Sequence, residues 1–447
     1  MKDDSSIHFF SLDPLNPRNK ILVPCPHVRS NNKIEVRDCY KSKSDQNNMF
    51  DLMFNCDLDD EKMCNKAKST FESVGRTLTS KLLLNTRIGL NATFRPLEGN
   101  LLGSAGPSRA IPFRDEDGKI RLYVQALAKQ FQLQVHPEYS SVDILADFNS
   151  NFPFWFEGDP QIQPNQIGFE ELVLHELMHG LGFLSGWNND YIEEDSLFLT
   201  PNIDGIIFNV GDNIERNSEL VFRGFLESAF DKYMVLISNK TLTTELTSNF
   251  DKFLDGQDTK FSSINEFKEK FKASPQFDIA KQMYNICIES NSIGFLLNTS
   301  NSKNEVVVLE TGINPFQGGS SLSHVDEKLF DNSSEFLMTF EQTPGRTLKD
   351  AITAGGGKNR KEEAIGPKIL AILETLGYPT SNNPNPYIPS VIFPQSLSTE
   401  DCPSSCTKAN SLYDSIMTDL SSDSNNLSAL NMASMIIFML GVFFILF

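Results

Sequence analysis

The sequence predicts an α+β fold made of short strands, one central helix and a largely helical insertion. Residues 88–94 and 142–148 alternate apolar and polar side chains with a period of two, which is typical of half-buried strands. Residues 169–183 repeat apolar side chains at helical spacing and finish in glycines, as a helix and its C-terminal cap do. From about 186 to 320, aromatic side chains recur at helical spacing.

The two strand segments have well-defined apolar faces. In the first strand this face consists of Ile88, Leu90, Ala92 and Phe94. In the second strand it consists of Val142, Ile144, Ala146 and Phe148. Between the strands, Asp117-Gly118 predicts a turn that joins short extended pieces. The surrounding residues lack the acidic spacing of an EF-hand loop, so we expect a turn without a calcium ion.

Farther along the chain, apolar side chains predict three helices and a hairpin. The first helix would align Phe222, Phe225, Leu226, Phe230 and Tyr233. The second would align Phe261, Ile264, Phe267 and Phe271. Next, Phe295–Leu297 and Val306–Leu309 flank a polar stretch and predict a hairpin. Pro367 and Gly377 then mark the start and the end of an apolar helix.

These elements divide the chain into six expected segments. A lead or pro-region comes first, and two subdomains flank the mostly helical insertion. A linker rich in Ser, Pro and Asn then leads to a hydrophobic tail. The bounds are 1–60, 61–185, 186–320, 321–380, 381–430 and 431–447.

Composition and charge exclude several classes of function. The chain has 447 residues, 40% of them hydrophobic and 22% charged, which is ordinary for a globular protein and unlike a multi-span membrane protein. With 39 basic and 58 acidic residues, the formal net charge is −19. A surface this acidic repels phosphate backbones, so we expect no nucleic-acid partner.

The seven cysteines favour a secreted protein with local disulfides. They cluster towards the two ends of the chain, apart from Cys287, and no CxxC pair occurs. Thiolate zinc sites and thioredoxin-like redox motifs therefore have no support. Because the number is odd, at least one thiol is unpaired or linked elsewhere.

The C-terminal end has the order of a GPI-attachment signal. Residues 435–447 are apolar but shorter than the roughly 20 residues that a membrane span needs. Small residues precede this tail, and the candidate attachment sites are Ser421, Ser422 and Ser424. A short tail anchor or a buried helix is the alternative. The resulting expectation is a protein outside the cell or on its surface, held to the membrane by a C-terminal lipid.

Two further features bear on secretion. Residues 1–20 lack the apolar core of about 7–15 residues that a signal peptide has, which favours a missing start over a wrong interpretation of the tail. N-glycosylation sequons are candidates at Asn91, Asn239, Asn298, Asn332 and Asn426. Chance alone predicts about that number in so Asn-rich a chain, so the sequons permit secretion without arguing for it.

The strongest chemical signal is HELMHGLGF at residues 175–183. With six histidines in the chain, on the order of 0.01 accidental H-E-x-x-H matches are expected. Residues four apart on a helix lie nearly above one another, so His175 and His179 can aim imidazole nitrogens at one ion. Glu176 lies about 100° round the helix, where it can take a proton from a metal-bound water. Two neutral imidazoles suit Zn²⁺.

A catalytic zinc needs a third protein ligand, and here it must come from another part of the chain. The metzincin pattern would place a histidine at 185, but the residue is Ser185, although Gly182 is in its expected place. His324 is the best candidate, since it follows the flexible run at 318–323 and precedes Met338. The other histidines fit worse: His8 and His27 precede the first recognisable strand, and His136 lies in a polar loop. A gluzincin-type glutamate is the alternative, and the candidates are Glu193, Glu194, Glu215 and Glu219.

This layout resembles leishmanolysin-type metallopeptidases, which are metzincins with a long insertion before the third histidine. The matching stretches are HELMHGLGF, GGSSLSHVD, SEFLMT and LAILETLGY, and the resemblance spans roughly 85–185 and 318–380. Its histidine-to-methionine spacing is a few residues longer than in leishmanolysin itself. The resemblance implies a zincin/metzincin-like domain with a twisted mixed sheet and an active-site helix. It also implies one zinc held by His175, His179 and His324, with Glu176 as the base and Met338 under the metal.

The function that follows from this resemblance is a zinc-dependent endopeptidase acting on peptides or proteins. In metzincins an edge strand pairs with extended substrate, and we expect residues 147–155 to do so here. A non-catalytic surface or adhesion protein on the same scaffold is the alternative from another class. It predicts damage to the base or the ligands, yet His175, Glu176 and His179 are all present. An intracellular zinc peptidase is a third interpretation, which takes the missing signal peptide at face value.

Overall fold

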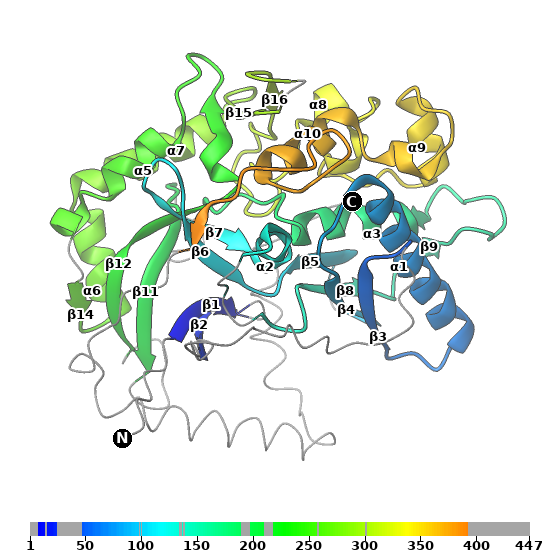
Figure 1. The fold of residues 1–447 in the computed structure, drawn as a ribbon, viewed down its shortest axis with the longest axis horizontal. Helices are drawn as coiled ribbons and strands as arrows, with labels where there is room; N and C mark the ends of the chain where they lie inside the picture. The colour runs from blue at the N-terminus through cyan, green and yellow to red at the C-terminus, as the bar shows by residue number, and fades with distance from the viewer. Residues whose placement is uncertain are drawn as a thin grey trace.

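The structure of the chain is a computed structural model (Figure 1). It describes the strands at 8–13 and 16–24 and most of the chain from 47 to 391. The gaps within that stretch are 98, 100, 134–135, 137–138, 189–196, 210–217, 257–258 and 300–301. The candidate lipid-attachment serines, the sequon at Asn426 and the apolar tail lie outside the described residues. Among the described helices, none has both the length and the apolar content needed to cross a bilayer.

A four-stranded mixed sheet forms the centre of the molecule. Its strands are β3 (Phe50–Cys56), β4 (Ile88–Arg95), β8 (Ile144–Asn149) and β5 (Gly103–Pro107), in that spatial order. The first three run parallel, whereas β5 runs antiparallel to β8. The predicted strands at 88–94 and 142–148 are thus confirmed, and the burial of β4 alternates as expected. The sheet is mixed.

The position of the edge strand corrects one prediction. Residues 147–155 were expected to form the edge, but β8 lies between β4 and β5, so β5 is the edge. The reason is that β5 reads Gly-Ser-Ala-Gly-Pro and has none of the apolar alternation by which a strand is recognised. Residues after β8 turn away and form only β9 (Phe154–Trp155), which pairs with β10 (Ile167–Gly168).

Two helices pack beside this sheet, α1 (Glu61–Lys81) and α3 (Phe169–Gly180) (Figure 1). The first residue of α3, Phe169, is fully buried, and its ring contacts Phe71 of α1, Phe94 of β4 and Phe148 of β8. The ring centroids are 5.4–6.0 Å apart, the usual range for aromatic pairs. This cluster fixes the start of α3 relative to the sheet.

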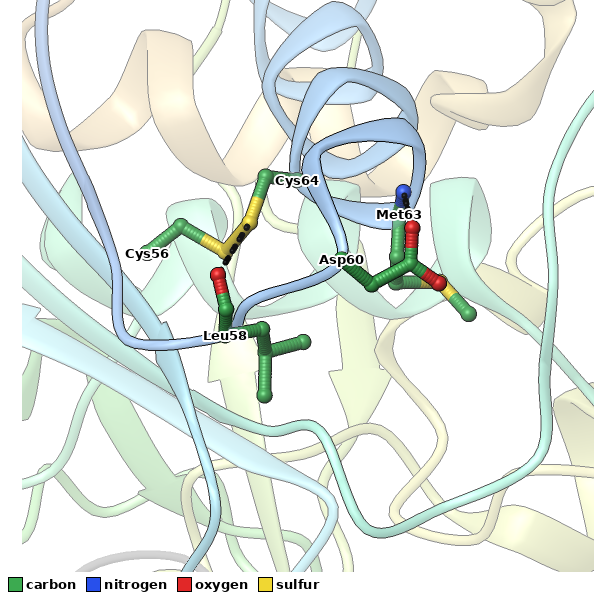
Figure 2. Close-up of a disulfide and its surroundings, with 5 residues drawn as sticks. All are labelled: Cys56, Leu58, Asp60, Met63 and Cys64. Carbon is green, nitrogen blue, oxygen red and sulfur yellow. Dashed lines mark hydrogen bonds between the residues drawn. A yellow bond between two sulfur atoms is a disulfide. The ribbon is translucent and has the colours of Figure 1, made fainter.

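A disulfide joins β3 to the first turn of α1. Cys56 ends the strand, Cys64 lies in the helix, and the Cα atoms are 5.8 Å apart (Figure 2). Between them, Asp60 caps the helix by accepting a hydrogen bond from the backbone N–H of Met63 at 3.0 Å. The expectation of local disulfides near the front of the chain is confirmed for this pair. Cys287 is a buried free thiol, whose pKa is raised by burial.

The insertion lies beside the central sheet, in green in Figure 1. A second sheet links the two parts, with the order β11-β12-β7-β6-β17. Its members, with β14 paired to β12, are β11 (Asn202–Asn209), β12 (Ser218–Ser228), β7 (Ile120–Val124), β6 (Ala110–Arg114), β17 (Ser390–Val391) and β14 (Thr259–Phe261). The predicted turn at Asp117-Gly118 joins β6 to β7, and Gly118 has a φ of 81°.

Strand β12 corrects the prediction of a helix around residues 222–233. Opposite the step from Asp204 to Gly205 on β11, β12 carries one extra residue, which is a β-bulge. The bulge places Phe222 and Phe225 on the same buried side, and their rings are 5.1 Å apart. Without it, side chains three apart on a strand face opposite ways. A bulged strand therefore imitates helical spacing in the sequence.

The rest of the insertion mixes helices with a small sheet, so the prediction that it is largely helical is wrong. The predicted helix near 261–271 is confirmed as α6, and the predicted hairpin as β15 paired with β16. The elements are η2 (Asp231–Tyr233), β13 (Met234–Leu236), α5 (Thr244–Phe250), η3 (Phe253–Gly256), α6 (Ile264–Lys272), α7 (Pro275–Cys287), β15 (Ile293–Leu296) and β16 (Val306–Val308).

The C-terminal elements cover the top of the molecule in Figure 1. They are α8 (Glu327–Phe330), η4 (Phe336–Met338), α9 (Leu348–Ala354), η5 (Lys361–Ala364) and α10 (Pro367–Leu376). The predicted helix from Pro367 is confirmed, and Gly377 ends it in a left-handed conformation with a φ of 118°. The short remaining elements are β1 (His8–Asp13), β2 (Asn16–Pro24), α2 (Gln125–Ala128) and η1 (Lys129–Phe131).

Candidate metal centre

Helix α3 presents the two histidines of the H-E-x-x-H motif on one side. His175 and His179 are one turn apart, and both are fully buried. The chain leaves α3 through Gly182, whose φ of 100° is a conformation that glycine adopts without strain. A Cβ at this position would also meet Val124 at 3.2 Å. The turn brings the carbonyl of Phe183 back to His179, whose Nδ1 lies 2.8 Å from it.

His324 reaches the same place from a loop that is held on both sides. Its backbone carbonyl accepts a hydrogen bond from Glu310 at 2.8 Å, and Val325 donates to the carbonyl of Met338 at 2.9 Å. These bonds tie the loop to the residues after β16 and to η4. The His324 side chain is 2% exposed, and its Nδ1 lies 2.9 Å from the carbonyl oxygen of Ser320.

The three imidazoles converge through their Nε2 atoms. The Nε2 of His175 lies 3.0 Å from that of His324 and 3.2 Å from that of His179. Among the described residues, these three form the only group of His, Cys, Asp or Glu with metal-ligand spacing. Two nitrogens bound at ~2.05 Å to one tetrahedral ion are about 3.3 Å apart, close to the two distances observed. The arrangement can therefore hold a metal ion, and its third histidine is His324, as predicted from the sequence.

Backbone carbonyls fix which nitrogen of each ring carries the proton. The Nδ1 atoms of His175, His179 and His324 contact the carbonyl oxygens of Leu337, Phe183 and Ser320. A carbonyl oxygen only accepts, so each Nδ1 must be the N–H donor. In the neutral rings, each Nε2 is then left with a lone pair that faces the Nε2 atoms of the other two histidines. Three lone pairs at this distance repel one another unless a cation lies between them.

Electrostatics keep the rings neutral. Burial lowers the pKa of His175 to about 4. Burial and the neighbouring imidazoles lower the pKa of His179 and of His324 well below the usual range. Neutral imidazole is the form that binds metal, so the site needs no deprotonation at neutral pH to receive a cation.

Glu176 lies beside the histidines with one oxygen held and one uncommitted. Its Oε2 accepts a hydrogen bond from the backbone N–H of Ala105, in β5, at 2.9 Å. Its Oε1 is buried, and no described residue contacts it by a hydrogen bond. Burial raises the pKa of Glu176 well above its usual range, opposed by the Ala105 bond. The edge strand thus orients the carboxylate through the backbone, which no side-chain pattern in the sequence could indicate.

Met338 lies in the turn that supports His175. It is fully buried in η4, which packs against α3, and its neighbour Leu337 supplies the carbonyl for His175. The role expected for Met338 beneath the metal stays a prediction.

The other candidate ligands do not join the cluster or lie outside the described residues. His136 stacks on Tyr139, with the ring centroids 4.9 Å apart, and is not part of the three-histidine group. Glu193, Glu194, Glu215 and His27 lie outside the described residues, as do the side chains of His8 and Glu219.

The candidate glycosylation sites differ in exposure. Asn239, Asn298 and Asn332 are exposed, whereas Asn91 is half-buried in β4, where its side chain accepts a hydrogen bond from Asn55 at 3.3 Å. The first three are therefore the better acceptors of a bulky glycan.

Comparison with known proteins gives a family whose function is unknown. The SPBPB7E8-like family matches residues 16–410, a stretch that contains all three clustered histidines. Over 403 aligned residues the chain is 27% identical to the uncharacterized protein PB7E8.01 of Schizosaccharomyces pombe. The aligned stretch covers 83% of this chain and 68% of that protein. No solved structure matches the chain. On the extent of the family match, the chain belongs to the SPBPB7E8-like family.

Proposed function

We propose that this protein is a zinc-dependent endopeptidase of the leishmanolysin-like type. The observation that carries the proposal is the convergence of three neutral histidines, with their Nδ1 atoms committed to carbonyls and their Nε2 atoms facing one another. Three histidines and an open fourth position are the ligand set of a catalytic zinc. The neighbouring glutamate and the buried Met338 add to the resemblance seen in the sequence.

The residues of the chain have distinct parts in the proposed reaction. Zn²⁺ held by the histidines would polarise the peptide carbonyl, lower the pKa of water from 15.7 towards about 7 and favour the ionised form of Glu176. Ala105 holds Oε2 of Glu176, so Oε1 takes the proton of the attacking water and then gives it to the leaving amine. The carbonyl partners keep the imidazoles from rotating during these steps.

The proposed peptide site is the edge of β5. Its backbone reaches the site, since Ala105 contacts Glu176, and β5 is the last strand of the central sheet. An extended peptide would add to this edge as a further strand. A substrate in which one amide is replaced by an ester loses a backbone donor, so it should show a higher KM. An unchanged KM at every position of the ester would argue against strand pairing.

We also propose that the protein is secreted or displayed on the cell surface. The Cys56–Cys64 disulfide supports this location, and the exposed sequons at Asn239, Asn298 and Asn332 are compatible with it. A lipid-anchored form should be released from membranes by a phospholipase specific for phosphatidylinositol, and its glycans should be removable by an amidase. Recovery of the protein from cytosol with Cys56 and Cys64 reduced would contradict the proposal.

The proposed function is tested by zinc content and peptide hydrolysis in the same preparations. Glu176→Gln should keep its zinc and lose about 10²–10⁴-fold in kcat/KM on a protein substrate, because proton transfer is lost. His324→Ala should lose most of its zinc. His136→Ala is the matched control, since it removes an imidazole outside the cluster, and it should change neither quantity.

Three outcomes would decide against the proposal. Full peptidase activity in zinc-loaded Glu176→Gln would remove the general base from the mechanism. An unchanged zinc content in His324→Ala would point to a glutamate ligand instead. Zinc binding without any hydrolysis in the wild type would favour the non-catalytic surface protein.

A further inference from the structure

One guanidinium joins the segments that carry the metal centre. Arg346 lies in the loop between η4 and α9, and its side chain is 11% exposed. Its Nη2 donates to Glu171 at 2.8 Å and its Nη1 to Asp331 at 3.0 Å. Its Cζ lies 5.7 Å from the centroid of the Phe336 ring, in a cation–π contact.

Each of these partners belongs to a segment that orients a ligand. Glu171 lies on α3, one turn before His175, so its contact with Arg346 holds that part of the helix. Asp331 directly follows α8, in the segment that connects His324 to η4. Phe336 begins η4, whose Leu337 supplies the carbonyl for His175. The Arg346 side chain therefore contacts helix α3, the segment between His324 and η4, and η4 itself.

The backbone around Arg346 is held against the start of α3. Gly345, with a φ of 73°, donates a hydrogen bond to the carbonyl of Gln166 at 2.8 Å. A Cβ placed on Gly168, the residue before α3, would lie 3.0 Å from the carbonyl oxygen of Arg346. These contacts fix the backbone of Arg346 relative to the start of α3.

The chemistry of the contacts requires arginine. Glu171 is 3% exposed, and its burial raises its pKa, which Arg346 opposes by its charge and its hydrogen bond. A planar guanidinium can donate to two carboxylates and lie over a ring at the same time. A lysine offers a compact charge and cannot make this set of contacts.

We propose that Arg346 is a positioning residue for the metal centre. It holds η4 and the segment after His324 against α3, so that the Leu337 carbonyl keeps the Nε2 of His175 aimed at the ion. This role rests on the proposed zinc site, but it concerns metal geometry and not peptide hydrolysis. A residue that orients ligands from outside the coordination shell typically changes metal affinity by about 10–100-fold when it is replaced.

The test uses Co²⁺ in place of zinc, because its visible absorption spectrum reports the ligand geometry. Arg346→Met and Arg346→Lys should weaken Co²⁺ binding about 10–100-fold and alter the spectrum. Arg360→Met is the matched control: this arginine makes a mostly exposed ion pair with Glu363, so its loss should change neither.

A double variant separates positioning from simple destabilisation. Arg346→Met leaves the Glu171 carboxylate buried without its partner, which lowers thermal stability by itself. Adding Glu171→Gln removes that charge, so the double variant should regain much of its melting temperature but not its Co²⁺ affinity. Wild-type Co²⁺ affinity and spectrum in the double variant would overturn the role of Arg346. Absence of Co²⁺ binding by the wild type would overturn the zinc site as well.

Discussion

The Nδ1 of His175 lies 2.6 Å from the carbonyl oxygen of Leu337. This contact crosses from α3 to a turn more than 160 residues later in the chain. The contact therefore joins the helix that carries the H-E-x-x-H motif to the turn that contains Met338. The carbonyl sets the tautomer of His175, and the same turn buries Met338.

Histidine tautomers test this arrangement without a metal. In protein stripped by a chelator at pH 7, the rings of His175, His179 and His324 should be neutral with the proton on Nδ1, because carbonyls accept there and burial disfavours the charged form. Long-range ¹⁵N–¹H correlation spectra distinguish the two tautomers. A proton on the Nε2 of two of these rings would show that the carbonyl contacts are wrong.

Met338 should contribute to stability through its buried volume. Met338→Ala removes a fully buried side chain of η4 and should lower the free energy of unfolding by about 2–5 kcal/mol. Met338→Leu keeps most of the volume and should cost less than about 1.5 kcal/mol. Urea unfolding of both variants measures the difference. Equal stabilities would place Met338 in a loosely packed position instead.

Gly182 should be sensitive to any side chain. Gly182→Ala forces alanine to a φ of 100° and places its Cβ 3.2 Å from Val124. We expect a loss of about 1–3 kcal/mol in the free energy of unfolding, together with weaker metal binding, because the turn also positions the carbonyl for His179. Gly118→Ala, at a turn with open space around it, is a control for the backbone strain alone. Its metal affinity should not change.

Asp231 ties the insertion to the turn after helix α3. Its buried carboxyl accepts hydrogen bonds from the Ser185 hydroxyl at 2.8 Å, from Gly186 N at 3.0 Å and from Ser228 N at 2.8 Å. Ser185 N in turn donates to the Ser323 hydroxyl, next to His324, at 3.2 Å. Burial raises the pKa of Asp231 from 3.8 to about 7, an effect larger than the opposing hydrogen bonds.

This shift predicts a pH dependence of stability. The pKa of Asp231 is higher in the folded state than in the unfolded state. Its contribution to the free energy of unfolding is therefore fully present below pH 3.8 and is lost as pH rises through 7. Asp231→Asn removes the titration. Between pH 5 and pH 8, the stability of the wild type should therefore fall relative to the variant by about 2–3 kcal/mol. Urea unfolding at the two pH values measures this, and a constant difference would exclude the raised pKa.

The sequence predicted elements whose signal is local. In the strand at 88–94, burial alternates from Leu90 onwards, as the sequence pattern predicts. The helix from 169 was recognised from its apolar spacing, although all of its residues except Glu170 are buried. The histidines at 175 and 179 follow from helix geometry alone. His324 was identified through a family resemblance, since no spacing rule relates it to the helix.

What could not be predicted depends on the backbone and on distant contacts. The bulge at Arg223 made a strand look helical, and the Gly-rich β5 carried no strand pattern. The carbonyl of Leu337 and the N–H of Ala105 orient the site through backbone groups, which are the same in every residue except proline. Such roles depend on where the backbone lies in the folded protein, and the residue type at these positions does not indicate them.

Diffraction on either side of the zinc absorption edge, from crystals of the zinc-loaded protein, tests the central claim most directly. We predict one anomalous peak about 2.0–2.1 Å from the Nε2 atoms of His175, His179 and His324. A zinc peak bound by other residues, with the ring of His324 turned away from the two on α3, would contradict the account.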